Sequence, residues 1–195
     1  MKKIIIVLAL AFSLLPLQSY GAPYTVDKDH SSVEFRVRHM MISKVSGEFK
    51  DYEGSFEFDE KKPANSKVKF TIQAASINTN HEKRDGHLKS ADFFEVEKHP
   101  TLNFESKKVT SVGGKKYKLS GSLTIHGVIK EVTFQVEYMG SVKDPYGNQR
   151  AGFVANTKIN RKDFGLTWNK TLETGGLIVG DEVEIQLNIE GIEKK

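Results

Sequence analysis

The ten residues DEVEIQLNIE, Asp181–Glu190, carry the clearest structural signal in the chain. Four apolar side chains alternate there with charged or amide side chains: Val183, Ile185, Leu187 and Ile189. Successive side chains of a β-strand point to opposite faces, so this period of two predicts a strand with one buried and one solvated face. The fold class therefore depends on how often the pattern recurs.

The same alternation recurs in seven other runs from Ser32 onward. Their apolar members are Val33, Phe35 and Val37; Phe56 and Phe58; Val68, Phe70 and Ile72; Leu102 and Phe104; Tyr117, Leu119, Leu123 and Ile125; Val132, Phe134, Val136 and Tyr138; and Phe153, Ala155 and Ile159. Turn residues such as Gly113-Gly114 and Asp144–Asn148 separate the runs. Eight short, one-sided strands without a repeat or a linker predict one all-β domain, an antiparallel barrel or sandwich.

Two places interrupt the alternation. His87 to Phe94 is predicted to form a short helix, because an aromatic pair follows Ser90 and Ala91 without strand alternation. Asn160 to Trp168 is the second interruption, where Gly165 divides a compact apolar set. We therefore expect one or two short helices in addition to the strands.

The first residues predict a secretory signal peptide, residues 1–21. Lys2 and Lys3 precede the apolar run IIIVLALAFSLLPL, and the small residues Ser19 and Gly21 stand at the positions a signal peptidase prefers. We therefore expect a mature domain of residues 22–195 in the periplasm, without stable membrane insertion.

Charge and cysteine content exclude several classes of function. Loss of Lys2 and Lys3 lowers the formal charge from +4 to +2, and the basic residues are spread along the chain, so no nucleic-acid partner is indicated. The chain has no cysteine, which rules out disulfides and thiolate metal sites.

The apolar strand faces are consistent with two kinds of barrel interior. An eight-stranded barrel is just wide enough either to be filled by side chains or to hold one small ligand. Most of the 12 phenylalanines lie on the apolar side of a predicted strand. If a cavity exists, its wall is therefore apolar, and a lipid tail is the expected guest.

The stretch NTNHEKRDGHLKSADFFEVEKHP, Asn78–Pro100, concentrates polar side chains. His81 and His87 lack the spacing of a zinc-protease helix and no third ligand is signalled, so we expect no metal site. Catalysis by Asp85 and His87 would need a nucleophile, and no Gly-x-Ser-x-Gly motif is present. The favoured interpretation is a loop braced by Arg84 and Asp85, with Arg84 as the candidate contact for a phosphate head group.

The remaining histidines and the single tryptophan are predicted to be packed or surface residues rather than ligands. They are scattered among strand ends and interruptions: His30, His39, His99, His126 and Trp168.

Several motifs resemble the YceI-like proteins, also called the polyisoprenoid-binding family. They are RDGHLKSADFF at residues 84–94, LTIHGV at 123–128, INRKDFG at 159–165 and GDEVEIQLNIEGIEK at 180–194. The resemblance extends over essentially the whole mature chain, in the same order.

The resemblance implies a lipocalin-like antiparallel β-barrel that holds a long isoprenoid lipid, such as a polyprenyl phosphate or a quinone. It implies no catalytic centre and no cofactor, with the lipid as cargo. The matched positions expected to line the tube are Phe35, Val37, Phe49, Phe56, Phe70, Ile72 and Phe104. The matched Arg84, Asp85 and His87 are expected to shape its polar mouth.

Three functions are consistent with these observations. The first is a periplasmic carrier of an isoprenoid lipid, and the second is an enzyme that acts on the head group of a prenyl lipid. The third is an interaction module with a filled barrel, and a homodimer is left open for any of them. A continuous internal cavity would separate the first two from the third.

Overall fold

The computed structural model describes residues 21–171 and 176–194, so the predicted signal peptide lies outside the described residues apart from Gly21. None of the helices in these two ranges is long and apolar enough to cross a membrane. Within the described ranges one α-helix, α1 (Glu82–Lys89), accompanies the strands. The strands are β1 (Ala22–Val26), β2 (Ser32–His39), β3 (Ser43–Phe49), β4 (Tyr52–Phe58), β5 (Lys67–Gln73), β6 (Ile77–Asn78), β7 (Thr101–Gly113), β8 (Lys116–Ile125), β9 (Val128–Lys143), β10 (Gln149–Asn160) and β11 (Val179–Glu193).

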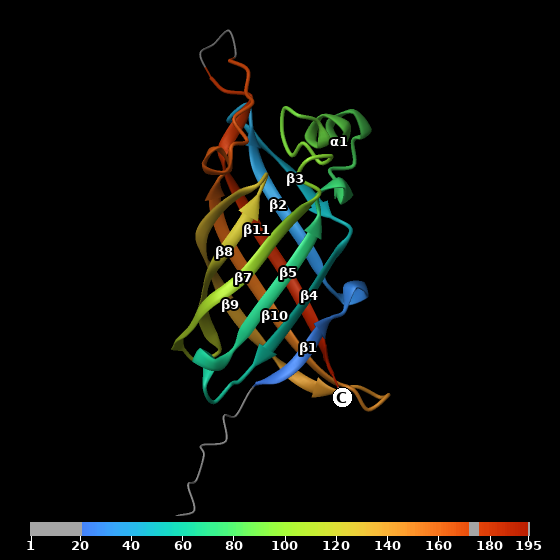
Figure 1. Cartoon of the computed structure of the whole chain (residues 1–195), viewed down its shortest axis with the longest axis vertical. Coiled ribbons are helices and arrows are strands. Elements are labelled where there is room, and N and C mark those ends of the chain that lie inside the picture. The colour runs from blue at the N-terminus through green and yellow to red at the C-terminus, as the bar shows by residue number, and fades with distance from the viewer. Residues whose placement is uncertain (1–20, 172–175, 195) are drawn as a thin grey trace, which may run out of the picture.

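The strands close into an antiparallel barrel, because β1 pairs with β4 on one side and with β11 on the other. β1 and β2 share one position in the ring, since the 3₁₀ turn Lys28–His30 separates them and both pair with β11. β3 and β4 share the next position, and two-residue β6 only extends the rim beside β3. The ring therefore has eight positions joined in sequence order (Figure 1), which confirms the predicted eight-stranded barrel.

Each of the eight predicted runs lies in a different position of the ring, whereas β1, β3 and β6 have no predicted counterpart. β1 has only five residues and includes Pro23, which weakens a strand signal. In β3, Gly47 stands between Val45 and Phe49 where an apolar residue would continue the series. The missed strands are thus the ones that alternate weakly.

The register places apolar residues opposite one another on the inner face. On β11, Ile185 faces Phe35 of β2, and Leu187 lies between Val33 of β2 and Ala155 of β10. A slip of one residue would turn the whole apolar set of a strand toward solvent. The alternation of β11 therefore fixes the register of both of its neighbours.

The polypeptide between β6 and β7 covers one end of the barrel; we call residues 81–100 the lid segment. Its helix begins at Glu82 and ends at Lys89, so the predicted range of His87 to Phe94 was wrong. His81 provides the reason, because its side chain caps the helix by accepting a hydrogen bond from the Arg84 amide. Residues after Ser90 form turns instead, closed by backbone hydrogen bonds from Phe94 to Leu88 and from Glu95 to Ser90.

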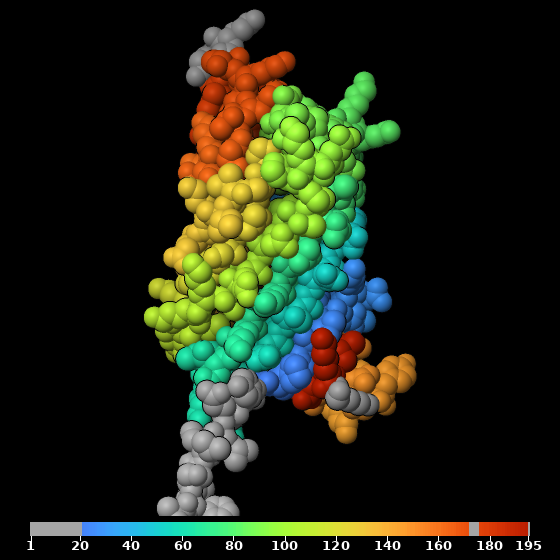
Figure 2. Space-filling view, viewed as in Figure 1, coloured from blue at the N-terminus to red at the C-terminus, as the bar shows by residue number. Residues whose placement is uncertain are grey.

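The second predicted interruption is confirmed as the 3₁₀ helix Arg161–Phe164, which ends at Gly165 in the left-handed conformation. It starts the connection from β10 to β11, which rises beside the lid segment in Figure 2, where the orange and green surfaces meet at the upper end. Both interruptions of the alternation therefore lie at the same end of the barrel (Figure 1).

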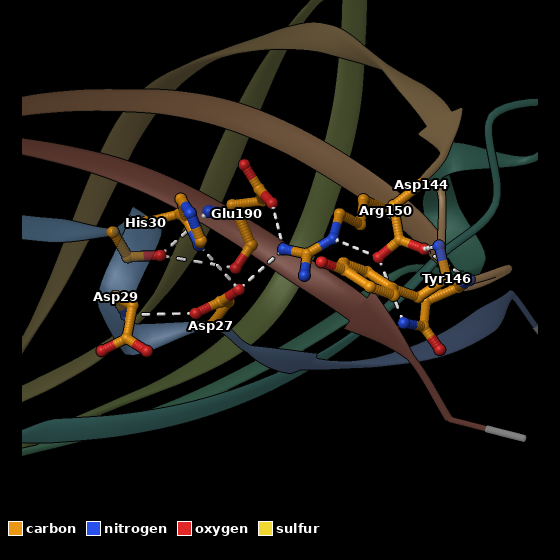
Figure 3. A network of polar contacts seen from close by, with 9 residues as sticks. Asp27, Asp29, His30, Asp144, Tyr146, Arg150 and Glu190 are labelled. Carbon is orange, nitrogen blue, oxygen red and sulfur yellow. Dashed lines mark hydrogen bonds and ion pairs between the residues drawn. The ribbon is translucent and has the colours of Figure 1, made fainter.

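A network of charged side chains fastens the opposite end from outside (Figure 3). Arg150 of β10 donates hydrogen bonds to Asp144 at 2.9 Å, to Asp27 at 2.7 Å and to Glu190. Asp27 also pairs with His30 at 2.9 Å. One guanidinium thus joins the β1 corner, the β9–β10 turn and the end of β11.

Candidate ligand-binding cavity

The barrel encloses a cavity of about 240 Å³. Its wall includes Phe93 and Phe94 of the lid segment at one end, and Phe58 and Tyr117 near the opposite end. The wall is apolar over nearly its whole length. The cavity is therefore elongated along the barrel axis, a shape suited to a chain-like apolar molecule.

Glycines on the inner face let phenylalanine rings lie along the wall. A methyl group added at Gly54 would be 2.4 Å from the Phe70 ring, and one at Gly121 would be 2.6 Å from the Phe104 ring. Gly47 and Gly191 receive the rings of Phe35 and Phe56 in the same way. Because each ring covers a residue without a side chain, it takes up less of the lumen than it would opposite a larger residue.

Aromatic rings close the end farthest from the lid segment. Phe58 lies at the centre, with ring centroids 4.8 Å from Tyr138, 5.0 Å from Phe153 and 5.8 Å from Tyr117. Tyr138 and Phe153 also contact each other at 5.2 Å. These interlocking rings form a plug of strand residues that belongs to the rigid barrel itself.

The other end is closed by residues that the barrel strands do not carry. Phe94 of the lid segment meets Phe49 edge to face at 5.9 Å. Phe93 packs against Trp168 at 5.3 Å, and Trp168 also contacts the His87 ring at 4.7 Å. Since side chains of two connecting segments make this closure, we regard the lid end as the entrance to the cavity.

Comparison with known proteins assigns the chain to a family. A family model described as the YceI-like domain matches residues 24–191. The chain belongs to the YceI-like family. It is 41% identical to a UPF0312 protein of Azotobacter vinelandii over 98% of both chains, and 42% identical to one of Serratia proteamaculans over the full length of both.

Solved structures share the YceI-like barrel. BcnA of Burkholderia cenocepacia superposes with a TM-score of 0.75 at 27% identity, covering 85% of this chain and 98% of that one. The YCEI protein of Campylobacter jejuni gives 0.69 at 36% identity, covering 81% and 90%. A polyisoprenoid binding domain from Saccharophagus degradans gives 0.63 at 15% identity, covering 88% and 98%, which shows the shared fold.

The seven apolar positions matched to the YceI-like family all lie on the cavity wall. They come from five strands of the barrel: Phe35, Val37, Phe49, Phe56, Phe70, Ile72 and Phe104. Contact between these side chains and a ligand stays a prediction. The wall also includes apolar residues outside this set of seven, such as Phe153, Leu166 and Leu187.

Arg84, Asp85 and His87 lie in α1, outside the cavity wall. Arg84 donates to the Thr79 hydroxyl at 2.7 Å and to the Thr79 carbonyl at 2.9 Å. Asp85 accepts from the Thr79 amide at 2.9 Å and from its hydroxyl at 2.5 Å. Burial alone would raise the pKa of Asp85, but the bonds from Thr79 outweigh it and lower the pKa. The pair braces the start of the lid segment around Thr79.

Arg161 is a polar residue of the cavity wall that sequence reasoning missed. Its side chain is only 4% exposed. It donates to the backbone carbonyls of Gly180 at 2.9 Å and Trp168 at 2.9 Å, and to Leu166, Val179 and Asp181. A guanidinium has five N–H donors, and these five acceptors use all of them. Arg161 therefore organises the β10–β11 connection; the only available signal was its place in the INRKDFG motif.

Proposed function

We propose that this chain is a periplasmic carrier whose barrel holds the tail of a long isoprenoid lipid, such as a polyprenyl phosphate or a quinone. The elongated, apolar cavity inside the barrel is the observation that carries the proposal. The polyisoprenoid binding domain with the same fold supports the choice of lipid class. The predicted signal peptide supports the periplasm as the place of action.

The cavity offers the tail a favourable environment without any chemical step. Burial of about ten methylene groups at about 0.8 kcal/mol each supplies about 8 kcal/mol before ordering costs, and a longer tail supplies proportionally more. Because aromatic rings close the far end, the polar head group would stay at the lid end, where it keeps its contact with water. The homodimer left open above stays a prediction.

The arrangement gives the enzymatic alternative no support of its own. That alternative relied on Asp85 and His87 at the cavity mouth, whereas Asp85 accepts two hydrogen bonds from Thr79 and His87 pairs with Asp92 at 2.7 Å. Neither side chain belongs to the cavity wall. Their removal is therefore expected to loosen the lid segment.

The experiment compares two neighbouring positions on β10. Ala155 is buried on the cavity wall, whereas Asn156 is exposed on the outer face. Ala155→Phe is expected to place a ring in the lumen and to reduce binding of a polyprenyl phosphate by about tenfold or more. Asn156→Phe adds the same ring outside and should bind like the wild type.

Native mass spectrometry after lipid addition gives the bound fraction for all three proteins, and circular dichroism confirms that each is folded. A wild-type protein that takes up no prenyl phosphate and no quinone would overturn the carrier proposal. Equal binding by both variants would place the lipid outside the barrel.

A further inference from the structure

Three potential metal ligands from distant parts of the sequence meet beside the lid segment: Glu95, His99 and His126. One ligand atom from each lies within 4.8 Å of the other two. His126 Nε2 is 3.6 Å from Glu95 Oε2, and the two histidine rings meet edge to face at 4.5 Å. Glu95 and His99 belong to the lid segment, whereas His126 is in the β8–β9 turn.

The cluster contains a buried polar atom that the protein leaves unsatisfied. His126 Nε2 is buried and makes no hydrogen bond with any described residue. Such an atom normally has a partner, because its desolvation is otherwise uncompensated. This nitrogen faces Oε2 of Glu95 at 3.6 Å, so one bound ion could contact both atoms.

The backbone is shaped to bring these side chains together. Glu95 and His126 both adopt the left-handed conformation, with φ of 45° and 52°. This conformation is unfavourable for residues with a side chain, and it concentrates where function requires it. Gly127 leaves room for the His99 ring, since a methyl group there would be 2.8 Å from it.

A second cluster of similar composition serves as a contrast. Asp27, His30 and Glu190 also bring three ligand atoms together at the other end of the barrel. Arg150 already provides the positive charge there, since it bonds to both carboxylates (Figure 3). No arginine is recorded as a partner of Glu95, His99 or His126 among the described residues.

Among the described residues, Lys98 is the lysine that pairs with the first cluster. It contacts Glu95 Oε1 at 2.5 Å, as a charge-assisted hydrogen bond does. The Lys98 side chain is 73% exposed and does not pair with Oε2 of Glu95, which faces His126 Nε2 at 3.6 Å. A second cation can therefore be bound by Oε2, and Lys98 can turn into solvent.

We propose that Glu95, His99 and His126 form a binding site for a divalent transition-metal ion such as Zn²⁺, which fastens the lid segment to the β8–β9 turn. Two imidazoles and one carboxylate are a ligand set that Zn²⁺ accepts, with a fourth position left for water. Ligand atoms around such an ion are about 3.3–3.5 Å apart, so the side chains need to close by about 1 Å.

The ion would act directly on the closure of the cavity. Glu95 follows Phe93 and Phe94, the two rings that close the lid end. Phe93 of the lid segment already packs against Trp168, so an ion would add a second attachment, from the lid segment to the β8–β9 turn. This site stands independently of the proposed lipid, because the ion contacts only protein side chains and water.

The test titrates metal-free protein, prepared with a chelator, with Zn²⁺ in a calorimeter. We expect one ion per chain, and binding about tenfold or more weaker in Glu95→Asn and His126→Asn. Asparagine suits these positions because it tolerates the left-handed conformation, so both variants should fold. His30→Asn in the contrasting cluster is the matched control and should bind as the wild type does.

Two further measurements make the outcome decisive. Co²⁺ bound by these ligands should give the visible absorption of a tetrahedral site in the wild type and lose it in His126→Asn. Zn²⁺ should also shift the emission of Trp168, the only tryptophan in the chain. Absence of Zn²⁺ binding in the wild type, or equal binding by the wild type and both asparagine variants, would overturn the proposal.

Discussion

Arg84, Arg150 and Arg161 carry the same guanidinium group, yet each is held by a different set of acceptors. Arg84 bonds to one threonine, Arg150 bonds to three carboxylates, and Arg161 bonds mainly to backbone carbonyls. Burial differs as well, since the Arg150 side chain is 20% exposed and that of Arg161 only 4%. The role of each arginine therefore depends on what the fold places around it.

Arg161→Met should destabilise the protein by about 2–4 kcal/mol, because it leaves several carbonyls of the β10–β11 connection without a donor. Arg161→Lys should recover only part of the loss, since an ammonium group has three donors rather than five. Urea unfolding measures both, with the exposed Lys162→Met as control. A loss for Arg161→Met no larger than that of the control would contradict the role assigned here.

Acid should weaken the Arg150 network. The hydrogen bond from Arg150 lowers the pKa of Asp144 well below its usual 3.8. Burial would raise the pKa of Asp27, but bonds from Arg150 and His30 outweigh it and lower the pKa. For both groups the stabilisation is complete above the unfolded-state pKa and is lost as the pH falls toward the folded-state values.

We therefore expect the thermal-unfolding midpoint of the wild type to fall by several degrees between about pH 5 and about pH 3. Arg150→Met should have a lower midpoint at neutral pH and a flatter dependence over this range. Calorimetric scans at a series of pH values test both statements. Parallel pH profiles for the two proteins would show that other carboxylates cause the acid sensitivity.

The turn between β2 and β3 is an element whose conformation opposes its sequence. Met40 and Met41 have φ of 51° and 63°, and the Ile42 amide bonds to the His39 carbonyl at 3.2 Å. Two consecutive left-handed residues characterise the hairpin turn that favours Asn-Gly. Met41 and Ile42 are moreover 55% and 87% exposed, so they gain little burial in return.

Replacement of Met40-Met41 by Asn-Gly should stabilise the protein by about 1–2 kcal/mol, because both residues tolerate left-handed backbone. The reverse design, Met41→Val, should destabilise it, since a β-branched residue resists this conformation. Chemical denaturation compares the three proteins. An Asn-Gly variant less stable than the wild type would show that contacts of the methionine side chains outweigh the strain.

The whole barrel has two different ends. Strand residues plug one end with rings in tilted and edge-to-face contact, whereas the lid segment and the β10–β11 connection close the other. An element with few strand hydrogen bonds opens more readily than the body of a sheet. Passage of a ligand is therefore expected at the lid end.

Phe94→Ala should speed the release of a bound fluorescent prenyl lipid several-fold, because it removes the lid ring that packs on Phe49. Phe58→Ala is the matched control, since Phe58 also lines the cavity but belongs to the plug. Stopped-flow displacement by unlabelled lipid gives both rates. Faster release from Phe58→Ala than from Phe94→Ala would place the entrance at the plugged end.

Strands, inner faces and fold class follow from local alternation, and these were predicted. Val183, Ile185 and Leu187 identify an inner face without reference to any other residue, because the period of two is a property of neighbouring positions. The short β1 and the Gly47-containing β3 were missed because their own sequences alternate weakly. The lid helix was predicted about five residues too late for a different reason, because a histidine, which is not a usual helix cap, starts it.

The cavity wall, the contacts of Arg84 and Asp85 with Thr79, and the proposed metal site depend instead on how the chain folds. Gly191 reads as a weak strand residue until the closed barrel brings the Phe56 ring onto it. Arg84 and Asp85 were predicted to brace this loop, but their shared partner Thr79 is known only from the fold. Contact of Arg84 with a phosphate head group stays a prediction. His99 and His126 looked like unrelated packed residues until the lid segment met the β8–β9 turn. Alternation is a property of neighbouring residues and can be recognised in the sequence. The contact partner of a side chain is known only once strand pairing has closed the barrel.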